Sequence, residues 1–144
     1  MQVKPIAIAS DHAGFELKSM LIEELGALGR EVLDLGTDGP GSVDYPDFGN
    51  ALAEALTAGR ADLGVLVCGT GIGISIAANR HPGVRAAVCH DQTSARLARE
   101  HNDANVLALG ARLIGAEVAK DCLRTFLSTR FAEGRHAPRV AKLG

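Results

Sequence analysis

The sequence has few aromatic residues and almost no excess of charge. It contains no Trp, one Tyr and four Phe among 144 residues, and its formal net charge is −2 at pH 7. Proteins that hold nucleic acids use aromatic stacking platforms and basic surfaces, so both shortages argue against a nucleic-acid partner. Because 47% of the residues are nevertheless hydrophobic, the core must be aliphatic.

A long unbroken apolar run is also missing. The longest candidate, residues 63–78, is interrupted by Gly64, Gly69, Gly71, Gly73 and Thr70, which argues against a membrane span. Residues 1–5 lead directly into a strand-like run without a signal-peptide pattern. The cysteines show neither disulfide nor metal spacing, and their odd number fits a reducing cytoplasm; they are Cys68, Cys89 and Cys122. We therefore expect a cytoplasmic protein that needs no metal and no cofactor.

Short aliphatic runs alternate with helical patterns along the chain. Several runs are apolar throughout, as in strands covered on both faces; they are residues 5–10, 31–35, 62–68, 84–89 and 105–109. The first helix has leucines on one stripe, ends at Gly29, and is followed by helices predicted at 47–56, 72–79, 92–100 and 115–127. This order predicts one α/β domain over residues 1–144, a three-layer α/β/α sandwich with a five-stranded parallel Rossmann-like sheet. A basic tail follows at 130–144.

Polar and glycine residues gather where these strands are expected to end. Ligands bind outside the carboxyl ends of strands in such sheets. The segments that arrive there are 10–12, 36–37, 68–70, 89–91 and 110–112. We therefore expect the functional site at this end of the sheet.

The glycine-rich stretch CGTGIGISIAAN at 68–79 begins where the third strand ends. Its spacing is G-x-G-x-G, which matches neither the dinucleotide fingerprint nor a P-loop. Two interpretations remain about equally good. The loop is either a tight strand-to-helix turn, or a set of backbone N–H groups at a helix N-terminus that stabilises an anion.

Cys68 strengthens the second interpretation. A thiol at the mouth of a helix N-terminus has a lowered pKa, and Thr70 is close enough in sequence to hydrogen-bond its thiolate. Buried cysteines are more often inert, and we expect this of Cys89 and Cys122, which lack such a setting.

Five ordered motifs carry a resemblance to a known family. They are SDHAG at 10–14, VDYPDF at 43–48, CGTGIGISIAAN at 68–79, REHNDANVLALGAR at 99–112 and EGRHAPRV at 133–140. Together they closely resemble the ribose-5-phosphate isomerase B family, which also includes isomerases of the galactose-6-phosphate type. The resemblance covers nearly the whole chain.

The resemblance implies an aldose–ketose isomerase that works through an enediolate. Cys68 would be the base, supported by Thr70; relatives that use a glutamate carry it at the position of Ile74, so this sequence is similar to the cysteine type. His101 would open the sugar ring. The enediolate would be held by Asn102 and by the N–H groups between 69 and 75, namely those of Gly69, Gly71, Ile72, Gly73 and Ser75.

The remaining roles concern the sugar and its phosphate. Asp11 and His12 resemble the family's contacts to sugar hydroxyls and the phosphate end, while Asp44 and Tyr45 are weaker candidates for the pocket wall. Arginine pairs two phosphate oxygens at once, which suits Arg112, Arg135 and Arg139. The family's tail arginines serve a neighbouring subunit, so the resemblance implies a homodimer with shared sites, or a tetramer built from such dimers. Pro138 departs from the family's pattern, in which many relatives have a basic or polar residue at this position. His81 and His90 receive no role.

Other functions stay open at this point. The default substrate is ribose 5-phosphate, converted to ribulose 5-phosphate in the pentose phosphate pathway of carbohydrate metabolism. Galactose or allose 6-phosphate, or a tetrose 4-phosphate, would need the same chemistry. A non-catalytic sensor of phosphate ligands is possible on the same fold. Thiol redox chemistry at Cys68 ranks last because no resolving cysteine is near in sequence.

Overall fold

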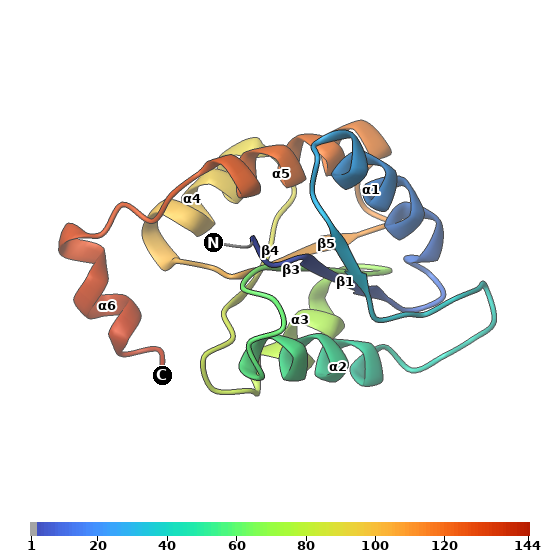
Figure 1. The fold of residues 1–144 in the computed structure, drawn as a ribbon, viewed down its shortest axis with the longest axis horizontal. Coiled ribbons are helices and arrows are strands. Elements are labelled where there is room, and N and C mark those ends of the chain that lie inside the picture. Colours follow the sequence, from blue (N-terminus) through green and yellow to red (C-terminus); the bar gives the residue numbers. More distant parts are fainter. Residues whose placement is uncertain (1–2) are drawn as a thin grey trace.

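The computed structural model describes residues 3–144, in which strands and helices alternate as the sequence predicts (Figure 1). The elements up to the third helix are β1 (Ile6–Ser10), α1 (Phe15–Ala27), β2 (Val32–Asp34), α2 (Tyr45–Thr57), β3 (Gly64–Cys68) and α3 (Ile72–Asn79). They are followed by β4 (Ala86–Val88), α4 (Gln92–Asn102), β5 (Val106–Gly110), α5 (Ala116–Ser128), a short 3₁₀ turn η1 (Gly134–His136) and α6 (Ala137–Ala141).

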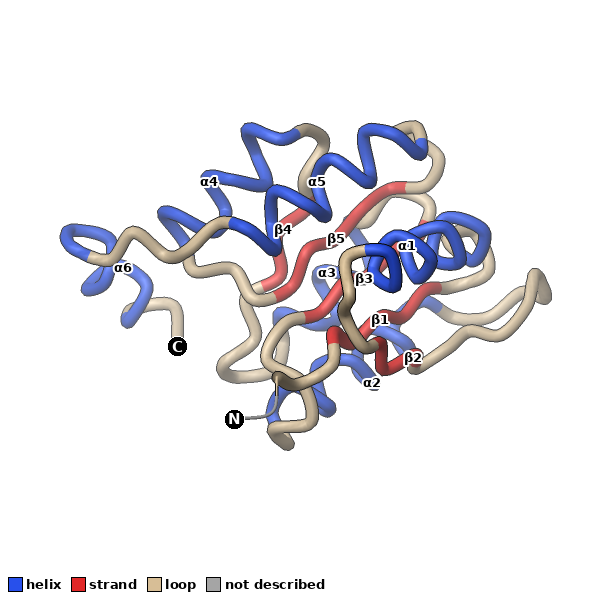
Figure 2. The backbone as a smooth tube through the Cα atoms, turned by 45° about the horizontal axis from the view of Figure 1, so that its top comes forward, coloured by secondary structure: helices blue, strands red, loops and turns tan. Residues whose placement is uncertain are grey.

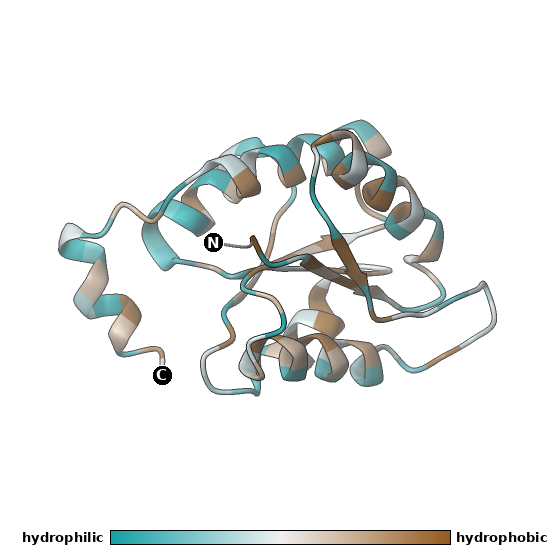
Figure 3. Cartoon of the chain, viewed as in Figure 1, coloured by the Kyte–Doolittle hydropathy of each residue, from teal (hydrophilic) through white to brown (hydrophobic). Residues whose placement is uncertain are grey.

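The strands form one parallel sheet in the order β2-β1-β3-β5-β4. Helices α1, α4 and α5 cover one face and α2 and α3 cover the other, so the predicted three-layer sandwich is confirmed (Figure 1). The three central strands, β1, β3 and β5, are buried along their whole length. Hydrophobic residues gather on the sheet and on the helix sides that face it (Figure 3). A strand with helices on both faces has no polar side, which explains its unbroken apolar sequence.

Differences from the prediction lie at element ends. The two outermost strands, β2 and β4, are three residues long and only partly buried, because each has a neighbour on one side alone. Helix α2 begins at Tyr45 rather than 47, with Pro46 in its first turn, a position that suits proline. Gly29 has a positive φ of 73° just after α1, so its predicted role at the end of that helix is confirmed.

The parallel sheet has two chemically different ends. At the carboxyl end, β1, β3 and β5 finish at Ser10, Cys68 and Gly110; at the amino end, β3 and β5 start at Gly64 and Val106. Four residue steps at about 3.3 Å each separate the two ends by roughly 13 Å along a strand. In a parallel sheet, the segment that follows each strand begins at the carboxyl end, and the segment that precedes each strand finishes at the amino end.

The tail is helical rather than extended. After α5 the chain passes the end of α4, where the Ala132 N–H donates to the Glu100 carbonyl at 3.0 Å, and then forms η1 and α6. Helix α6 projects beside the body of the domain, away from the carboxyl end of β3 (Figure 2). No helix within residues 3–144 is long and apolar enough to cross a membrane.

Candidate active site

The Cys68 side chain is the last of β3 and is 4% exposed. Its Sγ accepts a hydrogen bond of 3.2 Å from the Gly71 N–H, where the chain turns back at a φ of 78°. A backbone donor aimed at sulfur stabilises negative charge on it. The Thr70 Oγ1 accepts the Ile72 N–H at 3.1 Å at the start of α3, and no hydrogen bond joins Thr70 to Sγ within residues 3–144; its support of the thiolate stays a prediction.

Some of the backbone N–H groups around Cys68 already donate hydrogen bonds within the protein, and others do not. Those of Gly71, Ile72 and Ser75 are already bound, the last to the Gly71 carbonyl at 3.2 Å. The Ser75 hydroxyl likewise donates within the helix, to the Ile72 carbonyl at 2.7 Å. Within residues 3–144 no acceptor meets the N–H groups of Gly69, Thr70, Gly73 and Ile74. The donor pocket is thus narrower than the expected run from 69 to 75.

Each glycine of the loop is required by a different neighbour. A Cβ on Gly71 would lie 2.9 Å from the Leu109 carbonyl carbon, on top of the strain of its positive φ. A Cβ on Gly73 would lie 2.5 Å from the Tyr45 ring. Gly69 faces the Arg112 side chain, whose guanidinium would be 3.3 Å from such a Cβ. Backbone packing against β5 therefore requires glycine at position 71, whereas at positions 69 and 73 glycine lets the Arg112 and Tyr45 side chains approach the loop.

Asp11 and His12 follow β1 at the same end of the sheet. The Asp11 N–H donates to the Val67 carbonyl at 3.2 Å, and its Oδ1 accepts the Gly14 N–H at 3.0 Å, so the buried carboxylate is fixed beside β3. The Val43 N–H donates to the His12 Nδ1 at 3.1 Å. A neutral imidazole with Nδ1 as acceptor carries its proton on Nε2, so His12 offers an N–H donor.

Arg112 and Tyr45 complete this end. The Arg112 N–H donates to the Gly69 carbonyl at 2.9 Å, which holds the exposed guanidinium next to the glycine loop. Tyr45 is 42% exposed and its ring lies over Gly73. One chain therefore brings together most of the predicted site residues: Asp11, His12, Tyr45, Cys68, Gly69, Thr70, Gly71, Ile72, Gly73, Ser75 and Arg112.

Four predicted site residues lie away from the carboxyl end: His101, Asn102, Arg135 and Arg139. His101 and Asn102 are in the last turn of α4, which leads into β5, so they belong to the amino end of the sheet. Asn102 lines a hollow of about 380 Å³ there, together with Asn79 at the end of α3 and Leu143 from the tail. The parallel topology itself contains this information, because a helix that precedes a strand ends at the strand's beginning. Within one chain, His101 and Asn102 do not meet Cys68.

A second histidine, which the sequence did not single out, joins His101. The rings of His101 and His136 stack with centroids 4.4 Å apart and planes 17° from parallel. Desolvation lowers the pKa of His136 from its ordinary value, and His101, Arg135 and Arg139 lower it further, against an opposing effect of Glu100. The two tail arginines thus lie around this histidine pair. Neither has a carboxylate within ion-pair distance in residues 3–144.

The other two cysteines are core residues. Burial raises the pKa of Cys89 to about 11 and that of Cys122 to about 12, so both thiols stay neutral at physiological pH. Both side chains pack in the cluster beneath α1, α4 and α5. Their prediction as packing residues is confirmed.

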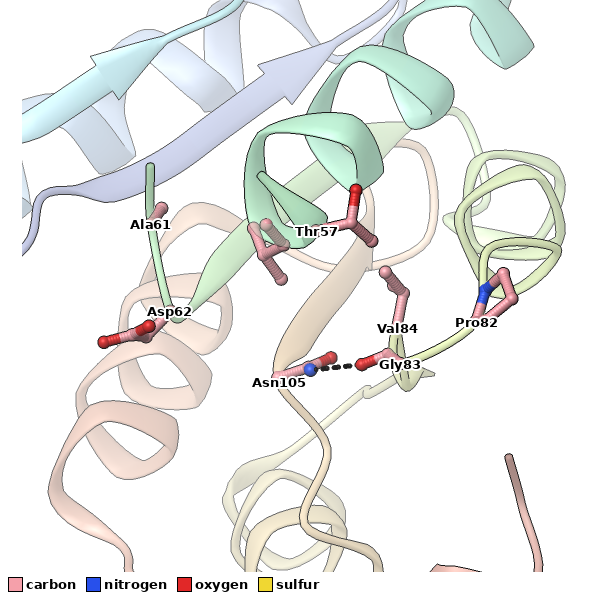
Figure 4. Close-up of a pocket in the computed structure, with 8 residues that line it drawn as sticks. Thr57, Ala61, Asp62, Pro82, Gly83, Val84 and Asn105 are labelled. Carbon is pink, nitrogen blue, oxygen red and sulfur yellow. Dashed lines mark hydrogen bonds between the residues drawn. The ribbon is translucent and has the colours of Figure 1, made fainter. Parts of the chain in front are cut away.

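A further hollow at the amino end has no chemistry of its own. It measures about 310 Å³ and lies between the end of α2 and the starts of β3 and β5 (Figure 4). Asp62 is the one ionisable residue among those that line it, and its carboxylate pairs with Lys4 at 3.2 Å. Asn105 closes another side by donating to the Gly83 carbonyl at 2.9 Å (Figure 4). These contacts fix the loop before β4.

Known proteins match the chain over almost its whole length. Residues 6–143 match the family model described as Ribose/Galactose Isomerase. Escherichia coli ribose-5-phosphate isomerase B is 46% identical over 138 residues, which are 96% of this chain and 93% of that protein. D-erythrulose-4-phosphate isomerase of Pectobacterium atrosepticum is 45% identical over 140 residues, 96% of this chain and 92% of that protein.

The fold agrees with these matches. The structure of Clostridium thermocellum ribose-5-phosphate isomerase B superimposes with a TM-score of 0.96 at 54% sequence identity, covering 97% of this chain and 95% of that one. A strand-ending cysteine under a glycine loop, with arginine and histidine around it, is thus found in a chain whose sequence and fold both match one family. The chain belongs to the ribose/galactose isomerase family.

Proposed function

We propose that the protein interconverts ribose 5-phosphate and ribulose 5-phosphate through an enediolate, with Cys68 as the base. The observation that carries this proposal is the geometry around the sulfur. One N–H group donates to Sγ, and four more, from Gly69, Thr70, Gly73 and Ile74, have no acceptor in residues 3–144. A sulfur that takes a proton and unpaired donors that accept a developing oxyanion are the two parts that such an isomerisation requires.

In this mechanism the Cys68 thiolate removes the proton from C2 of the open-chain aldose. The electron pair forms the C1–C2 double bond, and the carbonyl oxygen becomes the enediolate oxyanion held by the free N–H groups. The thiol then returns the proton to C1, while the proton of the C2 hydroxyl passes to the oxyanion on C1, so that C2 becomes the ketone and C1 carries a hydroxyl. Asp11 and the Nε2–H of His12 would bind sugar hydroxyls, and Arg112 would hold the phosphate.

The rest of the site would come from a second copy of the chain. His101, Asn102, Arg135 and Arg139 lie at the amino end of the sheet, roughly 13 Å or more from Cys68 along the strands. We propose a homodimer in which this group faces the carboxyl end of the partner. His101 would open the sugar ring, and Asn102 and the two arginines would reach the enediolate and the phosphate.

Helix α3 offers a surface for that dimer. It runs from Ile72 at the carboxyl end to Asn79 at the amino end, and Asn79 is bound to Ala86 at the start of β4. Ile72 and Ile76 are 51% and 56% exposed, one turn apart on its outer side. Two α3 helices packed antiparallel about a twofold axis would bury both isoleucines and place each amino end beside the other copy's glycine loop.

Substrate choice is tested by a coupled assay of the purified protein. We expect the highest kcat/KM with ribose 5-phosphate. Allose 6-phosphate, galactose 6-phosphate and erythrulose 4-phosphate are the alternatives, the last because one relative bears that name. A higher kcat/KM with a hexose or tetrose phosphate would replace the substrate while keeping the chemistry. Binding of all four without turnover would favour a sensor of phosphate ligands.

The shared site is tested by mixing two inactive variants. Cys68→Ala and His101→Ala each damage one half of the site. If the halves come from different copies, random exchange makes half of the dimers mixed, and each mixed dimer has one intact site of two. Activity should then recover to about a quarter of the wild-type value. No recovery after confirmed subunit exchange would show that both residues act within one chain.

We also propose a cytoplasmic location, which is consistent with three free cysteines.

A further inference from the structure

Lys18 on α1 is a buried cation for which the proposed chemistry has no use. Its side chain is 1% exposed, beside apolar neighbours such as Leu17 and Leu21 on the same helix. Burying an ammonium group carries a desolvation penalty of several kcal/mol, which good hydrogen bonds must offset. A Leu or Met at this position would pack the helix without that penalty. We therefore expect the lysine to be needed for the groups that it binds.

Its Nζ holds the start of the long connection between β2 and α2. It donates to the Asp34 Oδ1 at 2.7 Å and to the Thr37 carbonyl at 2.6 Å. The same Asp34 oxygen accepts the Gly36 N–H at 3.0 Å, and the Thr37 N–H donates to the Ser10 carbonyl at 2.8 Å. The ammonium thus ties the last residue of β2 and the first turn of the loop to α1, while backbone hydrogen bonds tie the same turn to Ser10 at the end of β1.

From this anchored start the loop passes beyond the carboxyl ends of the strands (Figure 1). Its middle is exposed at Asp38, Pro40, Gly41 and Ser42. The loop returns with the Val43 N–H, which donates to the Nδ1 of His12 at 3.1 Å. That single hydrogen bond keeps the imidazole proton on Nε2 and fixes the ring. Backbone hydrogen bonds to β1 hold residues 35–37, and Lys18 adds a buried side-chain anchor on the β2 side. Residues 38–42 connect this start to Val43, so a shift of the anchor is passed along the loop to the Val43 N–H.

We propose that Lys18 is a positioning residue for His12. It acts through residues 34–43: the buried ammonium fixes the start of the loop, and the Val43 N–H at its far side fixes the tautomer and orientation of the imidazole. The effect on turnover rests on the proposed function, in which His12 binds the substrate. The effect on the imidazole does not.

The first test reads the imidazole directly in Lys18→Met, which keeps the length of the side chain and removes its charge. Nitrogen NMR of the folded wild type should show His12 mainly as the Nε2–H tautomer, and Lys18→Met should shift it toward a mixture. The Val43 amide should exchange with solvent at least about tenfold faster, while Leu66 in β3 reports any global loss of stability. Lys4→Met removes an equivalent but exposed pair with Asp62 and should change neither signal.

The second test is a double-mutant cycle in kcat/KM. Lys18→Met alone should lower kcat/KM by about ten- to a hundredfold, because a small misplacement of a binding group has effects of that size. In a His12→Ala background the same substitution should have little further effect. A purely structural lysine would lower kcat/KM equally in both backgrounds.

The outcomes separate this proposal from the proposed function. An unchanged His12 tautomer and unchanged Val43 exchange in folded Lys18→Met would overturn the positioning role. Changed signals with a His12→Ala variant of full activity would support the positioning role and contradict the use of His12 in binding. If Lys18→Met does not fold, Asp34→Asn replaces it, since it removes the ion pair and keeps the bond to Thr37; the same signals should shift, by less, and their absence would overturn the proposal.

Discussion

The two ends of the sheet differ in how tightly their backbone is packed. At the carboxyl end, a Cβ on Gly14, Gly71 or Gly110 would lie within 3.0 Å of the backbone of another segment. At the amino end, Gly83 in the loop before β4 has no heavy atom within 4 Å of such a Cβ. At the carboxyl end, backbone segments thus cross in close contact. The amino end presents exposed side chains, including those of the tail, and side-chain hydrogen bonds hold its loop before β4.

The largest expected effect on kcat is that of a substitution at Cys68, at the carboxyl end. Cys68→Ala removes the proposed base, and we expect kcat to fall by on the order of 10³-fold or more. Binding of ribose 5-phosphate, measured by calorimetry, should remain largely intact because the proposed phosphate contacts are made by other residues. Cys122→Ala is the matched control: its thiol is buried and neutral, and kcat should stay within a few fold. A Cys68→Ala variant with near wild-type kcat would show that the base is another group.

The packing difference itself is tested by two alanines at glycines of similar φ. Gly71 has a φ of 78° and Gly83 a φ of 86°. Gly71→Ala adds a clash with the Leu109 backbone to the strain of the left-handed conformation, so the free energy of unfolding should fall by about 3 kcal/mol. Gly83→Ala has the strain alone and should cost about 1 kcal/mol. Equal losses in urea denaturation would refute the claim that the carboxyl end is the more crowded one.

The tail arginines at the amino end should influence substrate binding more than the chemical step. Arg135→Ala removes one of the proposed phosphate contacts, and KM for ribose 5-phosphate should rise about tenfold with kcat nearly unchanged. Arg130→Ala lies on the same exposed tail outside the proposed site and is the control, expected to leave both constants unchanged. An effect of Arg135→Ala on kcat alone would mean that this arginine acts in the chemical step.

The smallest expected effect concerns the His101–His136 stack. Since the folded protein lowers the pKa of His136, a released tail binds a proton more readily than a docked one. The stack is therefore fully stable above about pH 6.5, the ordinary value for histidine, and weakens as the pH falls below it. Proton NMR should detect this weakening at His136. His136→Phe keeps a ring without a charge and should abolish the pH dependence; if the dependence persists, other groups cause it.

The sequence was sufficient for the elements that are buried on both faces. Strands β1, β3 and β5 are short continuous apolar runs rich in aliphatic residues, a pattern typical of strands covered on both faces. The ends of the elements were harder to predict. Strands β2 and β4 are shorter than predicted because each is an outermost strand with one neighbour, and the local sequence pattern does not encode a strand's place in the sheet. The distance between Cys68 and His101 follows from the topology of a parallel sheet rather than from any motif. The partner of the sulfur, the Gly71 N–H in place of the Thr70 hydroxyl, depends on a backbone turn that side-chain identity does not specify.

The close approach of Gly14, Gly71 and Gly110 to neighbouring backbone limits how such an enzyme can diversify. Backbone segments packed this closely leave no room for an added side-chain atom, so a substrate of different length has to be accommodated by the segments that surround them. Those parts are the loop that ends at Tyr45 and the tail that carries Arg135 and Arg139. The ribose and erythrulose enzymes, which are 46% and 45% identical to this chain, are named for sugars of different length. A reaction centre with little room for change and replaceable surroundings would account for that difference.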